Sequence, residues 1–192
     1  MKVERVSYEI MTPSAARGVL EAVLWKPAIR WQVHVISVLA PIAWASVRRN
    51  ELKSRASPRV GHVFIEDDHA QRNSVVLRDV DYVISASFSL TERAGPEDNV
   101  RKFEEMFVRR LEKGQHAHAP YLGCREFAAD LSPAPERFAP IDPGVDRPLG
   151  MVFYDFDYRK PEAIKPYFFE ARLRGGVLDV PPPEAVFKEA SP

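Results

Sequence analysis

The alternation of apolar and polar positions is clearest at residues 80–90, where apolar side chains occupy every second position from Val80 to Leu90. This pattern predicts a strand with one buried face. Residues 29–39 are rich in branched side chains and predict a second strand, which Pro41 interrupts before residues 42–47 continue in extended form. A loose alternation over residues 3–10 predicts one further short strand.

Two segments have the spacing of an amphipathic helix. The first begins with Thr12 as N-cap and Pro13 in the first helical turn, carries one apolar face, and ends before Pro27. The second is predicted to open at Gly95-Pro96 and to end at Gly114, a natural C-terminal cap. Its expected buried stripe consists of Val100, Phe103, Phe107 and Leu111.

The remaining segments are predicted from turn residues and shorter apolar runs. We expect an exposed loop at residues 53–59, a strand at residues 121–127 and a proline-rich loop at residues 133–148. Strands are predicted at residues 149–158 and 167–173, with extended chain at 177–180 after the turn at Gly175-Gly176. The tail from residue 181 is expected to be loosely held.

The order strand–helix–strand occurs twice and predicts an α+β fold with a ferredoxin-like split βαβ unit. RNA-recognition domains use this fold, but many enzymes use it too, so it does not define a function. At 192 residues, with 45% hydrophobic and 28% charged residues, the composition is that of a soluble globular protein. The first residues lack a signal-peptide pattern, and a single cysteine fits a reducing cytoplasm, where we expect the protein to act.

The charge distribution favours a nucleic-acid partner more than the net charge does. The chain has 27 basic and 27 acidic residues, yet residues 1–60 carry ten Lys/Arg against four Asp/Glu. A neutral protein can hold a local basic groove. The aromatic residues Trp25, Trp31, Trp44 and Tyr121 are possible stacking platforms for unpaired bases, although each alone fits a core position.

Metal and nucleophile chemistry are less well supported. His116, His118 and Cys124 supply three candidate ligands without the paired spacing of a structural zinc site, and Cys124 is expected to be a small apolar residue in its strand. The run Glu66-Asp67-Asp68 is interpreted as a solvated turn. We therefore expect neither a metal nor a cofactor.

The chain carries, in order, VERVSYEIMTPSAARGVLEAVLWKPAIRW, VRRNE, IEDDHAQRNSVVLRDVDYVI and PYLGCREF. These blocks closely resemble the CRISPR-associated Cas-five family, in its d branch from type I-C systems. The resemblance implies a RAMP protein with a ferredoxin-like RNA-binding domain, here at residues 1–127. Residues 128–192 would form the proline-rich loop, a C-terminal antiparallel β extension and the tail. Relatives carry roughly twenty residues ahead of the first block, enough for a first strand. Two explanations stay open: the native start lies upstream of Met1, or this chain lacks that strand at the edge of its RNA-binding domain.

Members of that family cut precursor CRISPR RNA at each repeat hairpin and retain the 5′ handle within the interference complex, beside its large and backbone subunits. Cleavage needs no metal: a ribose 2′-hydroxyl attacks the neighbouring phosphorus and leaves a 2′,3′-cyclic phosphate. The resemblance therefore implies a CRISPR repeat RNA as partner. Together with the positions of basic residues, it suggests RNA contacts by Arg17, Lys26, Arg48, Arg49, Arg101 and Arg125.

The family pattern is incomplete at the catalytic positions. The family tyrosine is replaced by Leu24, and the Lys-His pair reads Lys102-Phe103. Lys102 remains as the expected catalytic cation, and His116 or His118 is the candidate replacement for proton transfer. Two hypotheses stay open: an endoribonuclease with a rearranged proton-transfer set, and a non-cleaving subunit that holds the 5′ handle.

Overall fold

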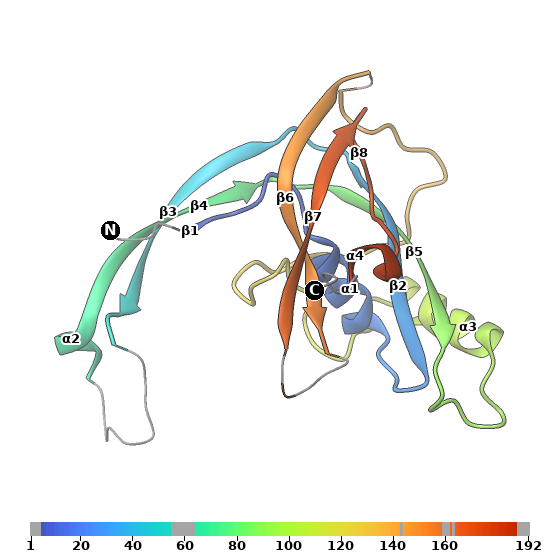
Figure 1. The fold of residues 1–192 in the computed structure, drawn as a ribbon. Coiled ribbons are helices and arrows are strands. Elements are labelled where there is room, and N and C mark those ends of the chain that lie inside the picture. Colours follow the sequence, from blue (N-terminus) through green and yellow to red (C-terminus); the bar gives the residue numbers. More distant parts are fainter. Residues whose placement is uncertain (1–4, 55–63, 143, 159–161, 163, 188–192) are drawn as a thin grey trace, which may run out of the picture. The chain divides into compact units, whose positions relative to one another are not determined.

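The computed structural model describes residues 5–54, 64–142, 144–158, 162 and 164–187. The chain groups into two compact units: unit 1 comprises Met1–Glu9 and Ile42–Val80, and unit 2 comprises Ile10–Pro41 and Asp81–Pro192. Figure 1 shows the elements, which are β1 (Arg5–Val6), α1 (Pro13–Val23), β2 (Ile29–Val38), β3 (Ala43–Leu52), α2 (Ile65–Asp68), β4 (His69–Arg78), β5 (Tyr82–Leu90), α3 (Val100–Glu112), β6 (Asp146–Asp157), β7 (Lys165–Arg174), β8 (Val177–Asp179) and α4 (Pro183–Val186). The fold class is thus α+β.

Unit 2 is built on a five-stranded sheet in the order β5-β2-β8-β7-β6. All neighbouring strands in it are antiparallel. Alternate residues of these strands and the apolar face of α1 form the main core, which includes Ala16, Val33, Ile36, Val152 and Leu178. The strand predicted at residues 80–90 is confirmed as β5, and the strand predicted at 29–39 is confirmed as β2.

The two edge strands of this sheet differ in sequence. β6 contains Pro148, four charged residues and two register irregularities opposite β7. β5 reads YVISASFSL and contains neither a charged residue nor a proline. Edge strands commonly carry charges, prolines or bulges that prevent pairing with another chain. β6 has all three features. β5 has neither charge nor proline, and the one register irregularity in its pairing with β2 comes from an extra residue in β2, between Val33 and Val35.

Helix α1 follows the sequence prediction closely. The Thr12 side chain accepts a hydrogen bond from the Ala15 backbone at 3.2 Å, and Pro13 occupies the first turn. The helix ends at Val23, and its backbone then turns extended at Leu24. Helix α3 begins at Val100, later than the predicted opening at Gly95-Pro96, because Asn99 caps it by accepting from the Lys102 backbone at 2.9 Å. Gly114, with φ 61°, ends this segment as predicted.

Unit 1 contains a three-stranded sheet in the order β1-β4-β3. β3 and β4 pair antiparallel over ten residues each, and β1 pairs in parallel with β4. The sequence did not predict β4, because its less exposed side includes the polar residues Arg72 and Ser74, which weaken the alternation. The run Glu66-Asp67-Asp68 lies in the short helix α2 and in this respect differs from a simple turn. Most of the loop predicted at 53–59 lies outside the described residues.

Two other predictions are wrong. Residues 121–127 form turns, because Gly123 has φ 77° and the Phe127 backbone donates to the Cys124 carbonyl at 2.9 Å; only an isolated bridge joins Tyr121 to Ala128. Cys124 is therefore exposed and is not a packed residue of a strand. The start of the tail is also ordered by packing, because α4 forms there and the ring of Phe187 lies 5.5 Å from that of Tyr154.

The described strands do not confirm the ferredoxin-like arrangement in detail. Between α1 and α3 the chain forms β2, then the β3–β4 pair of unit 1, and then β5. In the sheet of unit 2, β2 pairs with β5 on one side and with β8 on the other. The proposed division at residue 127 remains a prediction, since the compact units divide the chain at different places.

Candidate functional site

The first turn of α3 holds the lysine that the family resemblance singles out. The Lys102 ammonium lies 2.9 Å from Oδ1 of Asp98, and the lysine side chain is 45% exposed. Asp98 precedes the N-cap, and its other carboxylate oxygen accepts a hydrogen bond from the Gly95 backbone at 2.9 Å. Lys102 is thus held at a helix N-terminus, where backbone N–H groups and the helix dipole favour an anion.

The two positions at which the resemblance implies proton-transfer groups, Leu24 and Phe103, lie in one buried cluster, and Phe103 follows this lysine directly in the sequence. Leu24 is 0% exposed and Phe103 is 3% exposed, and both pack with Ala28, Ile29 and Trp31. The Lys102 ammonium is 5.7 Å from the centre of the Phe103 ring. The structure therefore places positions 24 and 103 in one buried cluster, and of these three residues only Lys102 reaches solvent.

The segment between α1 and β2 completes this region, which we call the α3 N-terminal site and define as Trp25, Lys26, Asp98, Asn99 and Lys102. Lys26 is exposed, and its charge helps to lower the pKa of Asp98. The Trp25 side chain is 61% exposed, which makes it available for stacking on an unpaired base. Trp31, by contrast, is a core residue whose indole N–H donates to the Leu24 carbonyl at 2.9 Å.

The charges within this site stabilise one another. The hydrogen bond from Lys102 is the largest cause that lowers the pKa of Asp98, followed by the bond from Gly95. The same contact with Asp98 raises the pKa of Lys102. Near neutral pH the carboxyl is an anion and the lysine is a cation, so Lys102 can bind phosphate or stabilise negative charge on it but is a poor proton acceptor.

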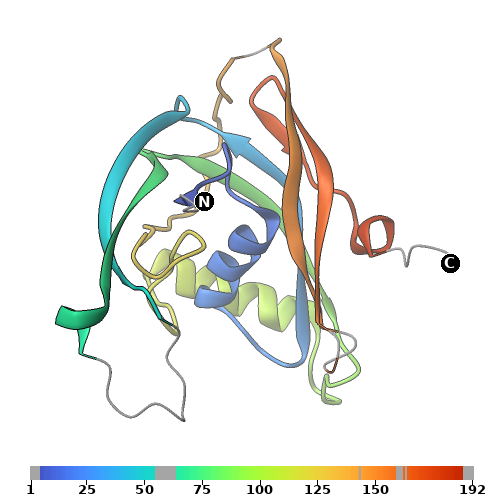
Figure 2. The same ribbon diagram turned by 60° about the vertical axis from the view of Figure 1, so that its left-hand side comes forward.

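The two histidines lie away from this site, beyond the other end of α3. Glu112 lies ten positions after Lys102 along the helix, a rise of about 15 Å, and Figure 2 shows the following loop at the end of α3 opposite its start. There the Ala117 backbone donates to the Ala22 carbonyl at 2.7 Å. His116 lines a small pocket with Asp130, and the His118 ring lies 5.9 Å from that of Tyr121. The structure does not bring either histidine to Lys102.

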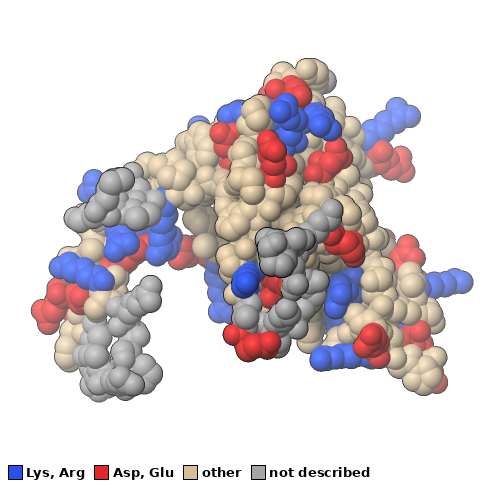
Figure 3. Space-filling model, in the orientation of Figure 1, with Lys and Arg blue, Asp and Glu red and all other residues tan. Residues whose placement is uncertain are grey.

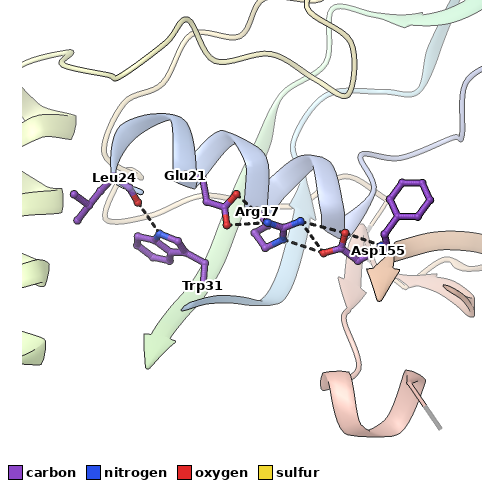
Figure 4. A network of polar contacts seen from close by, with 6 residues as sticks. Arg17, Glu21, Leu24, Trp31 and Asp155 are labelled. Carbon is purple, nitrogen blue, oxygen red and sulfur yellow. Dashed lines mark hydrogen bonds and ion pairs between the residues drawn. The ribbon is translucent and has the colours of Figure 1, made fainter. Parts of the chain in front are cut away.

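Arg17, a predicted RNA contact, forms ion pairs with two acidic side chains. Its guanidinium lies 2.8 Å from both Glu21 and Asp155, in the network of Figure 4. Burial lowers the pKa of Arg17, but the charges of Asp155 and Glu21 and their hydrogen bonds outweigh burial, so the pKa is raised. This arginine therefore joins α1 to β6.

The other predicted RNA contacts of unit 2 are at the surface. Arg101 forms an exposed ion pair with Glu105 at 2.8 Å. Arg125 lies exposed in the turns that replace the predicted strand. Figure 3 shows Lys and Arg side chains interspersed with Asp and Glu on the visible face of unit 2. Acidic side chains thus accompany the cations on this visible face.

Within unit 1, the solvent-facing side of the β3–β4 pair carries hydrogen-bonding side chains. Arg48 is exposed opposite Asn73, and Asn50 is exposed opposite Gln71. Arg49 points to the other side, is half-buried, and lies opposite Arg72. Arg72 is 3.6 Å from Glu51, which also pairs with Arg5 at 3.2 Å. We call the face with Arg48, Asn50, Gln71 and Asn73 the ribbon face.

Sequence reasoning missed Asp98, although its spacing of four residues before Lys102 is the spacing of a helical ion pair. Among the residues that the structure describes, no group of three His, Cys, Asp or Glu side chains is arranged to hold a metal ion. In the same part of the chain, no helix has the length and apolar character needed to cross a membrane.

Comparison with known proteins assigns the chain to a family. A family model described as CRISPR-associated protein (Cas_Cas5), of the Cas5d type, matches residues 1–186. The CRISPR pre-crRNA endoribonuclease Cas5d of Mannheimia succiniciproducens is 44% identical over 206 residues, covering 95% of this chain and 88% of the relative. The protein with the same name from Thermus thermophilus is 43% identical over 197 residues, covering 94% and 83%.

Solved structures agree on the fold. A crystal structure of a CRISPR-associated protein matches with a TM-score of 0.73 and 24% identity, covering 96% of this chain and 86% of that one. The functionally uncharacterized protein SMU1763c from Streptococcus mutans matches with a TM-score of 0.71 and 21% identity, covering 95% and 86%. By its sequence match over residues 1–186, the chain belongs to the Cas5d family of CRISPR-associated proteins.

Proposed function

We propose that this protein is an endoribonuclease that binds CRISPR repeat RNA and cleaves the precursor at the base of its hairpin. Two relatives more than 40% identical are named pre-crRNA endoribonucleases. The observation that carries the proposal is the position of Lys102, which is solvent-accessible at the N-terminus of α3 and lies beside Phe103, a member of the same buried cluster as Leu24.

The reaction is a metal-independent attack of a ribose 2′-hydroxyl on the adjacent phosphorus. The P–O5′ bond breaks, the 2′-hydroxyl proton is released, and the leaving oxygen takes up a proton, so the products are a 2′,3′-cyclic phosphate and a 5′-hydroxyl. Lys102 stabilises the negative charge that develops on the phosphorane. Proton transfer requires groups other than Leu24 and Phe103, and His116 and His118 remain predicted candidates only.

Each unit offers its own candidate RNA contacts: the α3 N-terminal site in unit 2 and the ribbon face in unit 1. Lys26 and Lys102 supply positive charge for phosphates, and Trp25 supplies a stacking surface. Arg48, with the neighbouring amides of Asn50, Gln71 and Asn73, supplies donors and acceptors to phosphates and bases. Arg101 and Arg125 extend the cationic surface, whereas the ion pairs of Arg17 suit a structural role.

The alternative is a non-cleaving subunit that holds the 5′ handle. One observation favours it: Leu24 and Phe103 are both buried among apolar residues, so the surface beside Lys102 presents no proton-transfer group from either position. The RNA-binding features would serve this function unchanged.

Assembly and fold detail extend the same proposal. Retention of the handle would place the protein beside the large and backbone subunits of a type I-C interference complex in the cytoplasm.

We also propose that α1, β2, β5 and α3 are the central elements of a ferredoxin-like unit. The antiparallel pairing of β2 with β5, and the packing of a helix against each, support this assignment.

The test is single-turnover cleavage of end-labelled repeat RNA, analysed on denaturing gels with and without EDTA. We expect one cut at the hairpin base, unaffected by EDTA, and no cut when the attacking nucleotide carries a 2′-deoxyribose. Lys102→Ala should lower the rate constant at least about tenfold while hairpin affinity stays nearly unchanged. Tight binding without cleavage by the wild type would instead establish the handle-binding alternative.

A further inference from the structure

Asp98 contacts Lys102 through a side chain that the local backbone already holds in place. One carboxylate oxygen accepts the Gly95 N–H at 2.9 Å, and the Asp98 backbone donates to the Gly95 carbonyl at 3.0 Å. The other oxygen accepts from the Lys102 ammonium at 2.9 Å. With 20% of its side chain exposed, Asp98 is also less accessible than Lys102. The backbone therefore holds the Asp98 carboxylate in place, and this carboxylate binds the longer and more flexible side chain of Lys102.

The ion pair one turn further along α3 lacks this support. Arg101 and Glu105 have the same spacing of four residues, but their side chains are 87% and 65% exposed. Exposed pairs of this kind restrict their side chains little, because water competes for both partners. The two pairs therefore share a spacing and differ in how firmly the acidic partner is held.

Asp98 also lies under the influence of a second cation. The charge of Lys26 also lowers the pKa of its carboxylate, as the smallest of the causes that act on it. An anion that interacts with two cations reduces their mutual repulsion before RNA binds.

We propose that Asp98 is a positioning residue for the reaction, which holds the Lys102 ammonium at the place where the scissile phosphate develops its charge. This inference rests on the proposed function. Asp98 does not itself touch the RNA; it reduces the motion of Lys102, so that the cation is already in place when the phosphorane forms.

Two variants distinguish the positioning of Lys102 by Asp98 from a general effect of negative charge near Lys102. Asp98→Asn keeps an oxygen that can accept from Gly95 but removes the anion that binds Lys102. Glu97→Gln removes the same charge from the neighbouring residue, whose charge also acts on Lys102. We expect Asp98→Asn to lower the single-turnover rate constant at saturating protein about tenfold. Its RNA affinity should be unchanged or higher, and Glu97→Gln should keep at least half of the wild-type rate constant.

A second readout does not depend on cleavage. In protein labelled with ¹³C at lysine Cε, NMR relaxation reports the motion of Lys102, whose signal is assigned by its loss in Lys102→Arg. In the wild type we expect Lys102 to be more ordered than the exposed Lys113. In Asp98→Asn, Lys102 should become as mobile as Lys113, and in Glu97→Gln it should stay ordered.

The outcomes distinguish the two proposals. Three results would overturn the positioning role. The first is an unchanged mobility of Lys102 in Asp98→Asn, and the second is a cleavage rate constant of Asp98→Asn above that of the wild type. The third is a loss of rate in Glu97→Gln as large as the loss in Asp98→Asn. If Asp98→Asn frees Lys102 but the wild type cuts nothing, the proposed reaction fails. The role of Asp98 in that reaction then fails with it, while the contact that holds Lys102 is upheld.

Discussion

The guanidinium of Arg17 lies 2.8 Å from the carboxylate of Asp155, so one ion pair joins the first helix of unit 2 to β6, 138 residues further along the chain. Glu21 binds the same guanidinium from the next turn of α1. Both contacts are more than two-thirds shielded from solvent, so they hold the helix whose last turn leads to Leu24 and the α3 N-terminal site.

Arg17→Ala is expected to lower the free energy of unfolding by about 1–3 kcal/mol, between the values typical of exposed and buried ion pairs. Urea unfolding followed by circular dichroism measures this loss. Arg101→Ala, which breaks a far more exposed pair, should change the free energy of unfolding by no more than about 0.5 kcal/mol. Equal effects of the two variants would contradict a structural role for Arg17.

Arg48→Glu should weaken binding of the repeat hairpin, because it replaces an exposed cation of the ribbon face with an anion. Each phosphate contact contributes about 0.7–0.9 to the slope of log affinity against log salt, so the slope should flatten by about that amount. Fluorescence anisotropy over a salt series provides the measurement. Arg172→Glu makes the same charge change at a residue paired with Asp146 and should leave the slope unaltered.

Restoring the family residues by Leu24→Tyr with Phe103→His tests whether their loss limits activity. Both positions are buried, so we expect the double variant to lose about 1–3 kcal/mol of stability from the added volume and the buried polar atoms. Any variant that remains folded should cleave faster than the wild type, because a proton-transfer group is again adjacent to Lys102. Chemical denaturation and single-turnover rates must be measured together; a stable variant without a rate gain would contradict this expectation.

Gly176→Ala should be more destabilising than a substitution at any open glycine. Gly176 has φ 74°, and a Cβ there would overlap the backbone oxygen and nitrogen of Ile141. Gly114 has φ 61° with no atom near its missing Cβ, so Gly114→Ala costs about 1–2 kcal/mol from backbone strain alone. Overpacking should add about 1–3 kcal/mol at Gly176. Thermal unfolding of both variants gives the comparison, and similar melting temperatures would argue against the close approach.

The sequence predicted those helices and strands in which buried side chains recur at the regular spacing of a helix or a strand. β5 was predicted because its alternate residues face the core, and α1 because Thr12 and Pro13 define its start. The strand at 121–127 was predicted from side chains alone, whereas Gly123 determines the backbone there through its positive φ. β4 is supported by pairing with β3, a partner about twenty-five residues away that composition does not reveal.

The candidate site was predictable only in part. Lys102 came from the family resemblance, and its spacing from Asp98 was visible but not interpreted. The distance of His116 and His118 from Lys102 depends on the direction in which the chain leaves α3, which is fixed by the contact of Ala117 with Ala22. Long-range contacts of this kind leave no signal in the local sequence.

The contrast between β5 and β6 has a consequence for handling the protein in solution. A concentrated sample brings sheet edges of different molecules together, and an uncharged edge of nine residues offers backbone donors and acceptors with little to repel a neighbour. Self-association should therefore begin at β5, and a lysine introduced at an exposed position such as Ser87 should raise the concentration at which samples remain monodisperse. The same change on β6 should have little effect, because charge and irregular register already separate that edge from its neighbours.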